Sequence, residues 1–286
     1  MTKRFSKLLK AAARSLSVLA GVTLCFLLGN HLETHAKGHK MNIRIEDYFS
    51  GSALELAKAA GKGDAAKVEA LVNSGVDPNT FGREEITPLM WALGNRNKTG
   101  VKALLKSGAN PNLRDSKGRN PMALAAGAPD IDFLKMLLDA GGNPDATNTI
   151  GEPLLRIAAL EDRFENLKLL LERGANINSV DRSNSTVMLL FARLNHFEQV
   201  YFLLSRGGDY TIRDLAGGTV PAYVFNATIN PKEFPELYAW QQKCRQFLEA
   251  RGVKNPGKGG PTKEQVDKRN QMIREIFEKK RQQQPH

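Results

Sequence analysis

Residues 87–119 read TPLMWALGNRNKTGVKALLKSGANPNLRDSKGR, and the pattern of this stretch recurs along the chain at a fixed step of 33 residues. The step is seen first in five glycines, Gly75, Gly108, Gly141, Gly174 and Gly207. A leucine stands four residues before each glycine, and apolar residues stand beside that leucine and three residues before it. A period between 20 and 50 residues indicates supersecondary units that stack on one another.

Each period predicts two helices. Val101, Leu104 and Leu105 have the spacing of one helix face, and Gly108 supplies the left-handed residue that ends such a helix. A shorter helix comes before it, marked by pairs that are again 33 residues apart: Leu89 and Ala92, Met122 and Ala125, Leu155 and Ala158. Polar turns rich in Asn and Pro, such as residues 109–112, separate the units. The predicted unit is therefore helix, turn, helix, glycine and projecting hairpin.

This unit resembles the ankyrin repeat. Residues 87–92 are similar to the family's opening Thr-Pro-Leu-His-x-Ala, and residues 107–112 and 173–178 to its closing Gly-Ala-Asp-x-Asn turn. The family's histidine is absent, and its place is taken by Ala57, Met90, Ala123, Arg156 and Leu189. The resemblance implies an all-α ankyrin-repeat solenoid of about six helix-turn-helix units with projecting β-hairpin loops.

The repeat domain is predicted to span residues 51–254. Its first helix, expected at residues 52–60, carries charged residues among its alanines, as an end repeat without a neighbour requires. The outer helices of the next four repeats are expected at residues 101–106, 133–139, 167–173 and 197–206. A sixth unit starts in phase at Thr219, is interrupted by an insertion at 226–235 and continues as a helix from about Glu236 to Ala250, which is typical of a C-terminal cap.

Residues 1–36 have the layout of an export signal, and residues 37–50 are a lead-in to the first repeat. A basic start precedes an uncharged, apolar run at residues 15–29, and small residues follow at Thr34 and Ala36. This layout predicts a cleaved secretory signal peptide or an uncleaved inner-membrane anchor. Both place the rest of the chain in the periplasm, because the positive end stays in the cytoplasm.

Residues 255–286 are predicted to be a linker and a basic amphipathic helix. Thr262 and Gln265 have the spacing of a capping box, and Val266, Ile273, Ile276 and Phe277 form an apolar stripe between basic residues. Such a helix can lie on an anionic membrane, dock a partner or fold back on the last repeat.

The sequence contains no phosphate-binding glycine loop, nucleophile elbow or paired cysteines at metal spacing, so we expect neither catalysis nor a cofactor. His31, His35 and His39 are four residues apart, but cleavage after Ala36 would separate them, so no metal site is expected either. Cys244 is the one cysteine beyond residue 36, which excludes an internal disulfide and favours a buried thiol.

With catalysis set aside, we expect a protein partner in the concave groove that the hairpins and short helices would line. Trp91 is expected to pack against the core. The residues that vary around the repeat consensus are the candidates for contact: Phe81, Arg83, Glu84, Ile86, Asn95, Arg96, Arg114, Lys117, Arg119, Ile150, Glu152, Glu161, Arg182, Arg193, Arg213 and Leu215. Seven of these are arginines, which are enriched at interface hot spots and pair bidentately with carboxylates.

The charge of the chain points in the same direction. Residues 1–36 hold five basic residues and one acidic residue, so the net charge of +11 falls to +7 without them. An acidic protein surface is therefore the expected partner, and anionic lipid could be contacted through the N-terminal segment or the C-terminal helix. Export argues against nucleic acid.

Three functions follow as hypotheses. The first, from the resemblance to exported bacterial ankyrin proteins, is a non-enzymatic periplasmic binder that acts as an immunity protein against a secreted antibacterial toxin of phospholipase type. The second, also from resemblance, is an envelope factor that supports a periplasmic enzyme such as a catalase under oxidative stress. The third is a membrane-surface organiser that acts through the basic C-terminal helix.

Overall fold

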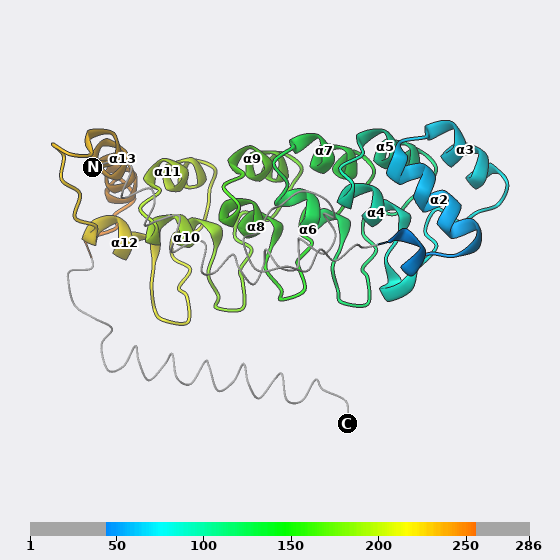
Figure 1. The fold of residues 1–286 in the computed structure, drawn as a ribbon. Coiled ribbons are helices and arrows are strands. Elements are labelled where there is room, and N and C mark those ends of the chain that lie inside the picture. Colours follow the sequence, from blue (N-terminus) through cyan, green and yellow to red (C-terminus); the bar gives the residue numbers. More distant parts are fainter. Residues whose placement is uncertain (1–43, 256–286) are drawn as a thin grey trace, which may run out of the picture. The chain divides into compact units, whose positions relative to one another are not determined.

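The computed structural model describes residues 44–255 (Figure 1). The export segment at 1–36, the first half of the lead-in, the histidine trio and the basic C-terminal helix lie outside the described residues. Within residues 44–255 the chain has twelve α-helices and no β-strand, so the predicted all-α class is confirmed. These residues form two compact units, the first with residues 44–149 and 160–173 and the second with 150–159 and 174–255.

From α4 onward, short helices alternate with longer ones along the chain. Up to residue 173 the elements are η1 (Ile45–Asp47), α2 (Gly51–Lys62), α3 (Ala65–Asn73), η2 (Arg83–Glu85), α4 (Pro88–Gly94), α5 (Lys98–Lys106), α6 (Pro121–Ala126), α7 (Ile131–Asp139), α8 (Leu154–Leu160) and α9 (Phe164–Glu172). They are followed by α10 (Val187–Arg193), α11 (Phe197–Ser205), α12 (Val220–Asn226) and α13 (Pro235–Glu249).

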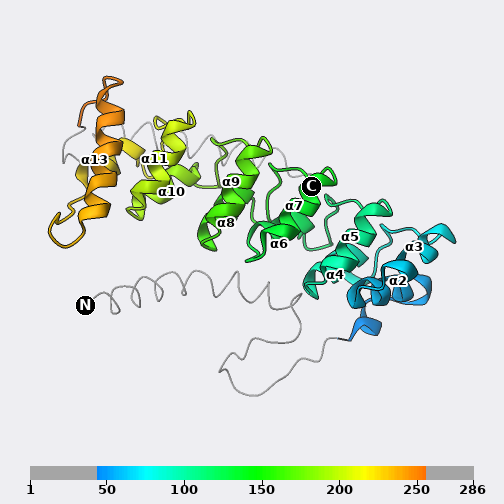
Figure 2. The same ribbon diagram turned by 90° about the horizontal axis from the view of Figure 1, so that it is seen from above.

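In the first unit the helices form two rows. Helices α2, α4 and α6 lie side by side in one row, and α3, α5, α7 and α9 lie side by side in the other (Figures 1 and 2). Each helix of one row also contacts its sequence neighbour in the other, as α4 contacts α5 and α6 contacts α7. This is the stacking of helix pairs that the period predicts.

The second unit repeats this arrangement at the C-terminal end of the chain. Helix α10 contacts α12, α11 contacts α13, and the two rows contact each other through the pairs α10–α11 and α12–α13. The insertion between α12 and α13 spans residues 227–234, and α13 is the longest helix of the described chain at 15 residues.

The short helices α4, α6, α10 and α12 begin at the same phase of the repeat, and a side chain caps each of these four. The Thr87 side chain accepts a hydrogen bond from the Met90 backbone N–H, and Asn120 does the same for Ala123. Thr186 and Thr219 accept from the backbone N–H of Leu189 and Ala222. A capping oxygen satisfies an N–H that the first turn of a helix leaves without a partner.

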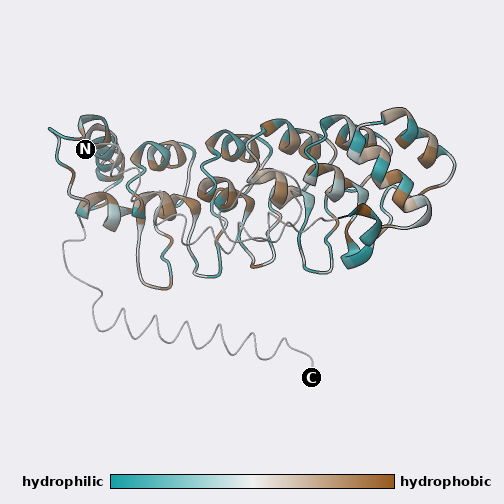
Figure 3. Ribbon diagram, in the orientation of Figure 1, coloured by the Kyte–Doolittle hydropathy of each residue, from teal (hydrophilic) through white to brown (hydrophobic). Residues whose placement is uncertain are grey.

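The predicted core leucines are buried where the repeats have neighbours on both sides. Leu104, Leu137 and Leu170 of the first unit and Leu203 of the second have no exposed surface. Leu71, in the outer helix of the terminal repeat, is only partly buried. In Figure 3 the helices of both units carry hydrophobic as well as hydrophilic residues, as expected for helices with one buried face.

The end of the lead-in packs on the first repeats. Phe49 is 3% exposed, and its ring lies 6.1 Å from that of Trp91, which also meets Tyr48 at 6.0 Å. The Tyr48 carbonyl accepts a hydrogen bond from the Arg83 backbone N–H. Trp91 therefore packs, as expected from its place in a short helix.

Cys244 lies on α13 and is buried against α11. Its Sγ donates to the Phe197 carbonyl at 3.3 Å, and burial raises the pKa of its thiol to about 12. None of the helices in residues 44–255 has both the length and the apolar character that a membrane span requires.

We expect Cys244 to resist alkylation in the native protein at pH 8, because a thiol with a raised pKa is protonated there and thiolate is the reactive form. Peptide mass mapping after iodoacetamide treatment should find Cys244 unmodified without denaturant and modified in urea. A Lys102→Cys variant provides an exposed thiol as a positive control on α5. Rapid native modification of Cys244 would contradict its assigned burial.

Candidate partner-binding surface

The loops between the helix pairs close in a repeated way. In the first unit, Asp115 Oδ1 accepts from the backbone N–H groups of Lys117 and Arg119 at 3.0 and 2.8 Å. The Asp115 N–H donates to the Arg119 carbonyl, and Gly118, at φ 75°, makes the turn at the tip. A single aspartate thus fixes the path of the loop.

The second unit builds two loops in the same manner. Asp181 Oδ1 accepts from the backbone N–H groups of Ser183 and Ser185, and an isolated antiparallel bridge joins Val180 and Thr186. In the next loop Asp214 Oδ1 accepts from the N–H groups of Ala216 and Gly218.

Each of these aspartates also binds an arginine. Asp115 Oδ2 accepts from Arg119 Nε, and Asp214 Oδ2 accepts from Arg193. Asp181 Oδ2 lies 3.2 Å from Arg156 Nε, which also meets Glu152 at 3.4 Å. The carboxylates at the loop bases are therefore neutralised within the protein.

Within each unit, neighbouring loops are joined near their tips by backbone hydrogen bonds. In the first unit, the Ser116 N–H donates to the Glu84 carbonyl at 3.0 Å. In the second, the Leu215 N–H donates to the Ser183 carbonyl at 2.9 Å, and Asn184 Nδ2 donates to the Arg213 carbonyl at 2.7 Å. These bonds hold the loops in place before any partner binds.

Glu84 adds charged contacts to the hydrogen bonds between the neighbouring loops of the first unit. Its carboxylate accepts from Lys117 Nζ at 2.7 Å and lies 3.6 Å from Arg119 Nη2. The hydrogen bond from Lys117 is the main cause of a lowered Glu84 pKa, and the nearby positive charges lower it further. The contribution of this carboxylate to stability is therefore complete above its unfolded-state pKa and is lost as the pH falls through the lower folded pKa.

We expect the Lys117→Ala substitution to raise the pKa of Glu84 toward its ordinary value, because it removes the hydrogen bond that favours the charged form. An NMR titration of the Glu84 carboxyl carbon in both proteins measures this directly. Lys106→Ala removes a lysine from α5 and serves as the control, with no expected change. An unchanged Glu84 pKa in the Lys117 variant would show that the two side chains do not pair.

The sixteen candidate residues divide between the two units and differ in availability. The first unit holds Phe81, Arg83, Glu84, Ile86, Asn95, Arg96, Arg114, Lys117, Arg119 and Glu161, and the second holds Ile150, Glu152, Arg182, Arg193, Arg213 and Leu215. Exposed side chains are those of Phe81, Arg83, Asn95, Arg96, Arg114, Lys117, Ile150, Arg182, Arg193 and Arg213. Glu84, Glu152, Glu161 and Leu215 are partly buried.

Two candidates are buried, and the prediction that they contact a partner is wrong. Ile86 is 3% exposed and packs in a core cluster with Phe49, Ala57 and Met90. Arg119 is 7% exposed, because its guanidinium is used to bind Asp115. The sequence does not show whether the side chain of an isoleucine or an arginine next to a loop points into the protein or into solvent.

Three further cations are exposed but already bonded within the protein. Arg114 donates through Nη1 to the Gly118 carbonyl and through Nη2 to the Thr147 carbonyl. Lys117 binds Glu84, and Arg193 binds Asp214. The expectation of seven arginines available for a partner is therefore too high.

The residues that sequence reasoning missed are the loop aspartates. Asp115, Asp181 and Asp214 lie in one phase of the 33-residue period, in which Asn148 stands between the first two and Gly82 before them. This regular spacing is the signal that could have identified them.

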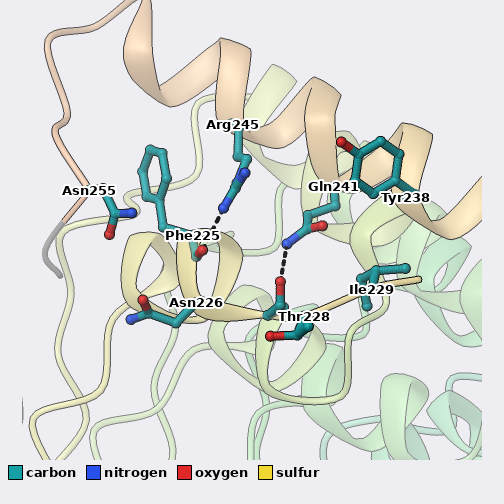
Figure 4. A pocket seen from close by; sticks show the side chains of 9 residues that line it. Phe225, Asn226, Thr228, Ile229, Tyr238, Gln241, Arg245 and Asn255 are labelled. Atoms are coloured by element: carbon teal, nitrogen blue, oxygen red, sulfur yellow. Dashed lines mark hydrogen bonds between the residues drawn. The ribbon is translucent and has the colours of Figure 1, made fainter. Parts of the chain in front are cut away.

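A pocket of about 420 Å³ lies in the second unit between α12, α13 and the insertion (Figure 4). Gln241 Nε2 donates to the Ala227 carbonyl and Arg245 donates to the Phe225 carbonyl, so both side chains cap the end of α12. The polar groups of this pocket thus hold the last two helices together. Within residues 44–255, no three His, Cys, Asp or Glu side chains lie close enough to hold a metal ion.

Comparison with known protein families gives one result. A family model described as ankyrin repeats (3 copies) matches residues 56–148 and 122–214, which together cover more than half of the chain. A search of the curated proteins found no match to the chain.

Proposed function

The chain belongs to the ankyrin-repeat family, whose repeats are protein–protein interaction modules, and we propose that it binds one protein partner in the periplasm through its loops. The loops and the short helices provide the contact surface, and no reaction of the protein's own is involved. The residues offered in the first unit are Phe81, Arg83, Asn95 and Arg96, and those in the second are Ile150, Arg182, Arg213 and Leu215.

The observation that supports this proposal is the bonding between neighbouring loops. Because the Ser116 and Leu215 N–H groups bind the carbonyls of the preceding loops, these loops need little ordering when a partner arrives. A surface fixed in advance loses less conformational entropy on binding and can reach high affinity by shape complementarity. A surface of this kind can block the active site of another protein by shape complementarity.

We propose further that the partner is a secreted antibacterial toxin, of the phospholipase type expected from the resemblance to exported bacterial ankyrin proteins. The apolar run and small residues of the first 36 residues support location in the periplasm, where such a toxin would arrive. The protein would then act as an immunity protein. The envelope-factor and membrane-organiser hypotheses become alternative outcomes of the test.

The test starts from the full chain with a C-terminal affinity tag, expressed in its own host and captured from the envelope fraction. We expect one stoichiometric partner whose enzymatic activity is inhibited by the purified protein at a 1:1 ratio. A strain lacking the protein should intoxicate itself and recover when the wild-type chain is restored. Peroxide sensitivity without self-intoxication would instead favour the envelope factor, and capture of lipid without protein would favour the membrane organiser.

A further inference from the structure

We propose that the second unit binds a segment of the partner that presents carboxylate side chains together with apolar ones. The binding surface consists of Ile150, Val180, Arg182, Arg213 and Leu215, which we call the arginine loop surface. This inference rests on the proposed function and states the chemistry of the partner at one place.

The charges of the second-unit loops favour an acidic ligand. Of their carboxylates, Glu152, Asp181 and Asp214 are already bound by arginines from the neighbouring short helices. A fourth, Asp209, is partly buried and accepts from the backbone N–H and hydroxyl of Thr211. In contrast, Arg182 and Arg213 are exposed, and among residues 44–255 neither side chain has a hydrogen-bond or ion-pair partner. The charge that is left for a ligand on these loops is therefore positive.

The repeat explains why Arg213 is available. Arg114 occupies the same position three periods earlier, and its guanidinium binds the carbonyls of Gly118 in its own loop and Thr147 in the next one. Within residues 44–255, the loop of Arg213 is the last loop between two helix pairs and leads into α12, so this part of the chain has no next loop to supply a carbonyl at that position. The end of the array thus leaves free a guanidinium that an internal repeat would use.

Arg182 is accessible for a different reason. A Cβ added to Gly151 would lie 3.5 Å from Arg182 Nε, so the arginine side chain passes over a loop tip that has no side chain of its own. Gly151 adopts φ 77°, a conformation that other residues rarely take. The loop tip under Arg182 therefore has no side chain that could cover the arginine, and its backbone adopts a conformation that favours glycine.

Apolar side chains stand beside these two arginines. Ile150 is 51% exposed and Val180 is 38% exposed, and Leu215 is partly buried. A guanidinium can hold a carboxylate with two parallel hydrogen bonds, and the stem of the arginine packs on apolar groups. Charged and apolar contacts of this kind, close together on a fixed frame, are typical of interface hot spots.

The first experiment needs no knowledge of the partner. The full-length protein is titrated with a fluorescein-labelled acidic peptide, Glu-Glu-Leu-Glu-Glu-Leu-Glu-Glu, and with the same peptide in which Lys replaces Glu. We expect the acidic peptide to bind with a Kd that rises with salt, and the basic peptide not to bind. Absence of acidic-peptide binding at millimolar concentration would overturn the inference.

The variants assign this binding to the surface. Arg182→Glu with Arg213→Glu is expected to weaken acidic-peptide binding about tenfold or more. Lys232→Glu with Lys243→Glu makes the same change of charge in the insertion and on α13, and should leave the Kd nearly unchanged. Arg182→Gln with Arg213→Gln should give an intermediate loss, and circular dichroism melts verify that each variant folds.

Two comparisons separate this inference from the proposed function. If the captured partner binds the Arg182→Glu, Arg213→Glu variant as tightly as the wild type, the inference is wrong and the general binding function stands. If no stoichiometric partner exists while the acidic peptide still binds through these arginines, the proposed function fails instead. Sedimentation with phosphatidylglycerol vesicles that depends on the same two arginines would assign the surface to lipid and contradict a protein ligand.

Discussion

Replacing Gly100 by alanine is expected to lower the free energy of unfolding by about 3 kcal/mol, although alanine is the better helix former. A Cβ at this position would lie 1.8 Å from the Ala60 carbonyl oxygen and 2.6 Å from its carbon, and these are backbone atoms that cannot rotate away. The gain in helix propensity is only about 1 kcal/mol. Helix α5 must therefore move away from α2, and the contacts of both helices are lost.

Urea unfolding followed by circular dichroism measures the effect, with Thr99→Ala as the matched control. Thr99 is exposed at the neighbouring position of α5, so its change should stay within about 0.5 kcal/mol. Hydrogen exchange should show the largest loss of protection in α2 and α5. A Gly100→Ala protein as stable as the wild type would mean that the two helices do not approach as closely as described.

The second large effect is expected at Asn166. This side chain is 2% exposed, and its Nδ2 donates to the carbonyls of Ala125, Ala126 and Ala128 at 3.3, 3.0 and 2.9 Å. Asn166→Ala removes the donors from all three carbonyls, of which that of Ala125 still accepts from the Ala128 N–H. A buried polar group without a partner costs about 1–3 kcal/mol, so we expect a total loss of about 3 kcal/mol.

Denaturant unfolding again provides the measurement, and Glu165→Ala is the control. Glu165 is exposed and pairs with Lys168, a surface contact that contributes well under 1 kcal/mol. Asn166→Asp separates the two explanations of a loss, because it keeps the size of the side chain and removes its donors. Should Asn166→Asp remain as stable as the wild type, the hydrogen bonds to α6 would carry no stability.

Gly100 and Asn166 show what the sequence could and could not predict. Both occupy the same position of the 33-residue period, two repeats apart, and Phe133 occupies it in between. The period predicted the helix pairs because leucines such as Leu104 and Leu137 recur in it. A position that holds Gly, Phe and Asn in turn has no pattern, so its three different packing roles could not be predicted.

Helix boundaries show a smaller error with a clear cause. Helix α5 was expected to start at residue 101 and starts at Lys98, because Asn97 caps it by accepting from the Gly100 N–H. Helix α7 likewise starts two residues before its expected position, after the cap Asp130. The apolar stripe predicts only the buried part of a helix. The helix itself starts earlier, at a polar turn that follows the capping residue.

The candidate surface was predicted less well than the fold. The loops were placed correctly in the chain, but the direction of a loop side chain depends on pairs such as Arg119 with Asp115 and Arg193 with Asp214. These partners are 4 and 21 residues apart, so no single spacing marks them. The sequence alone therefore identified the arginines but could not show which of them already bind a carboxylate of the same protein.

The loop tips are joined to one another by main-chain groups, as in the bonds from Ser116 to Glu84 and from Leu215 to Ser183. Main-chain groups are the same for almost every amino acid, so mutations of outward-pointing tip residues leave this scaffold intact. Such a protein can acquire new binding preferences by successive single changes and keep its melting temperature throughout. When a target alters its surface under selection, the binder can evolve alongside it without passing through an unfolded intermediate sequence.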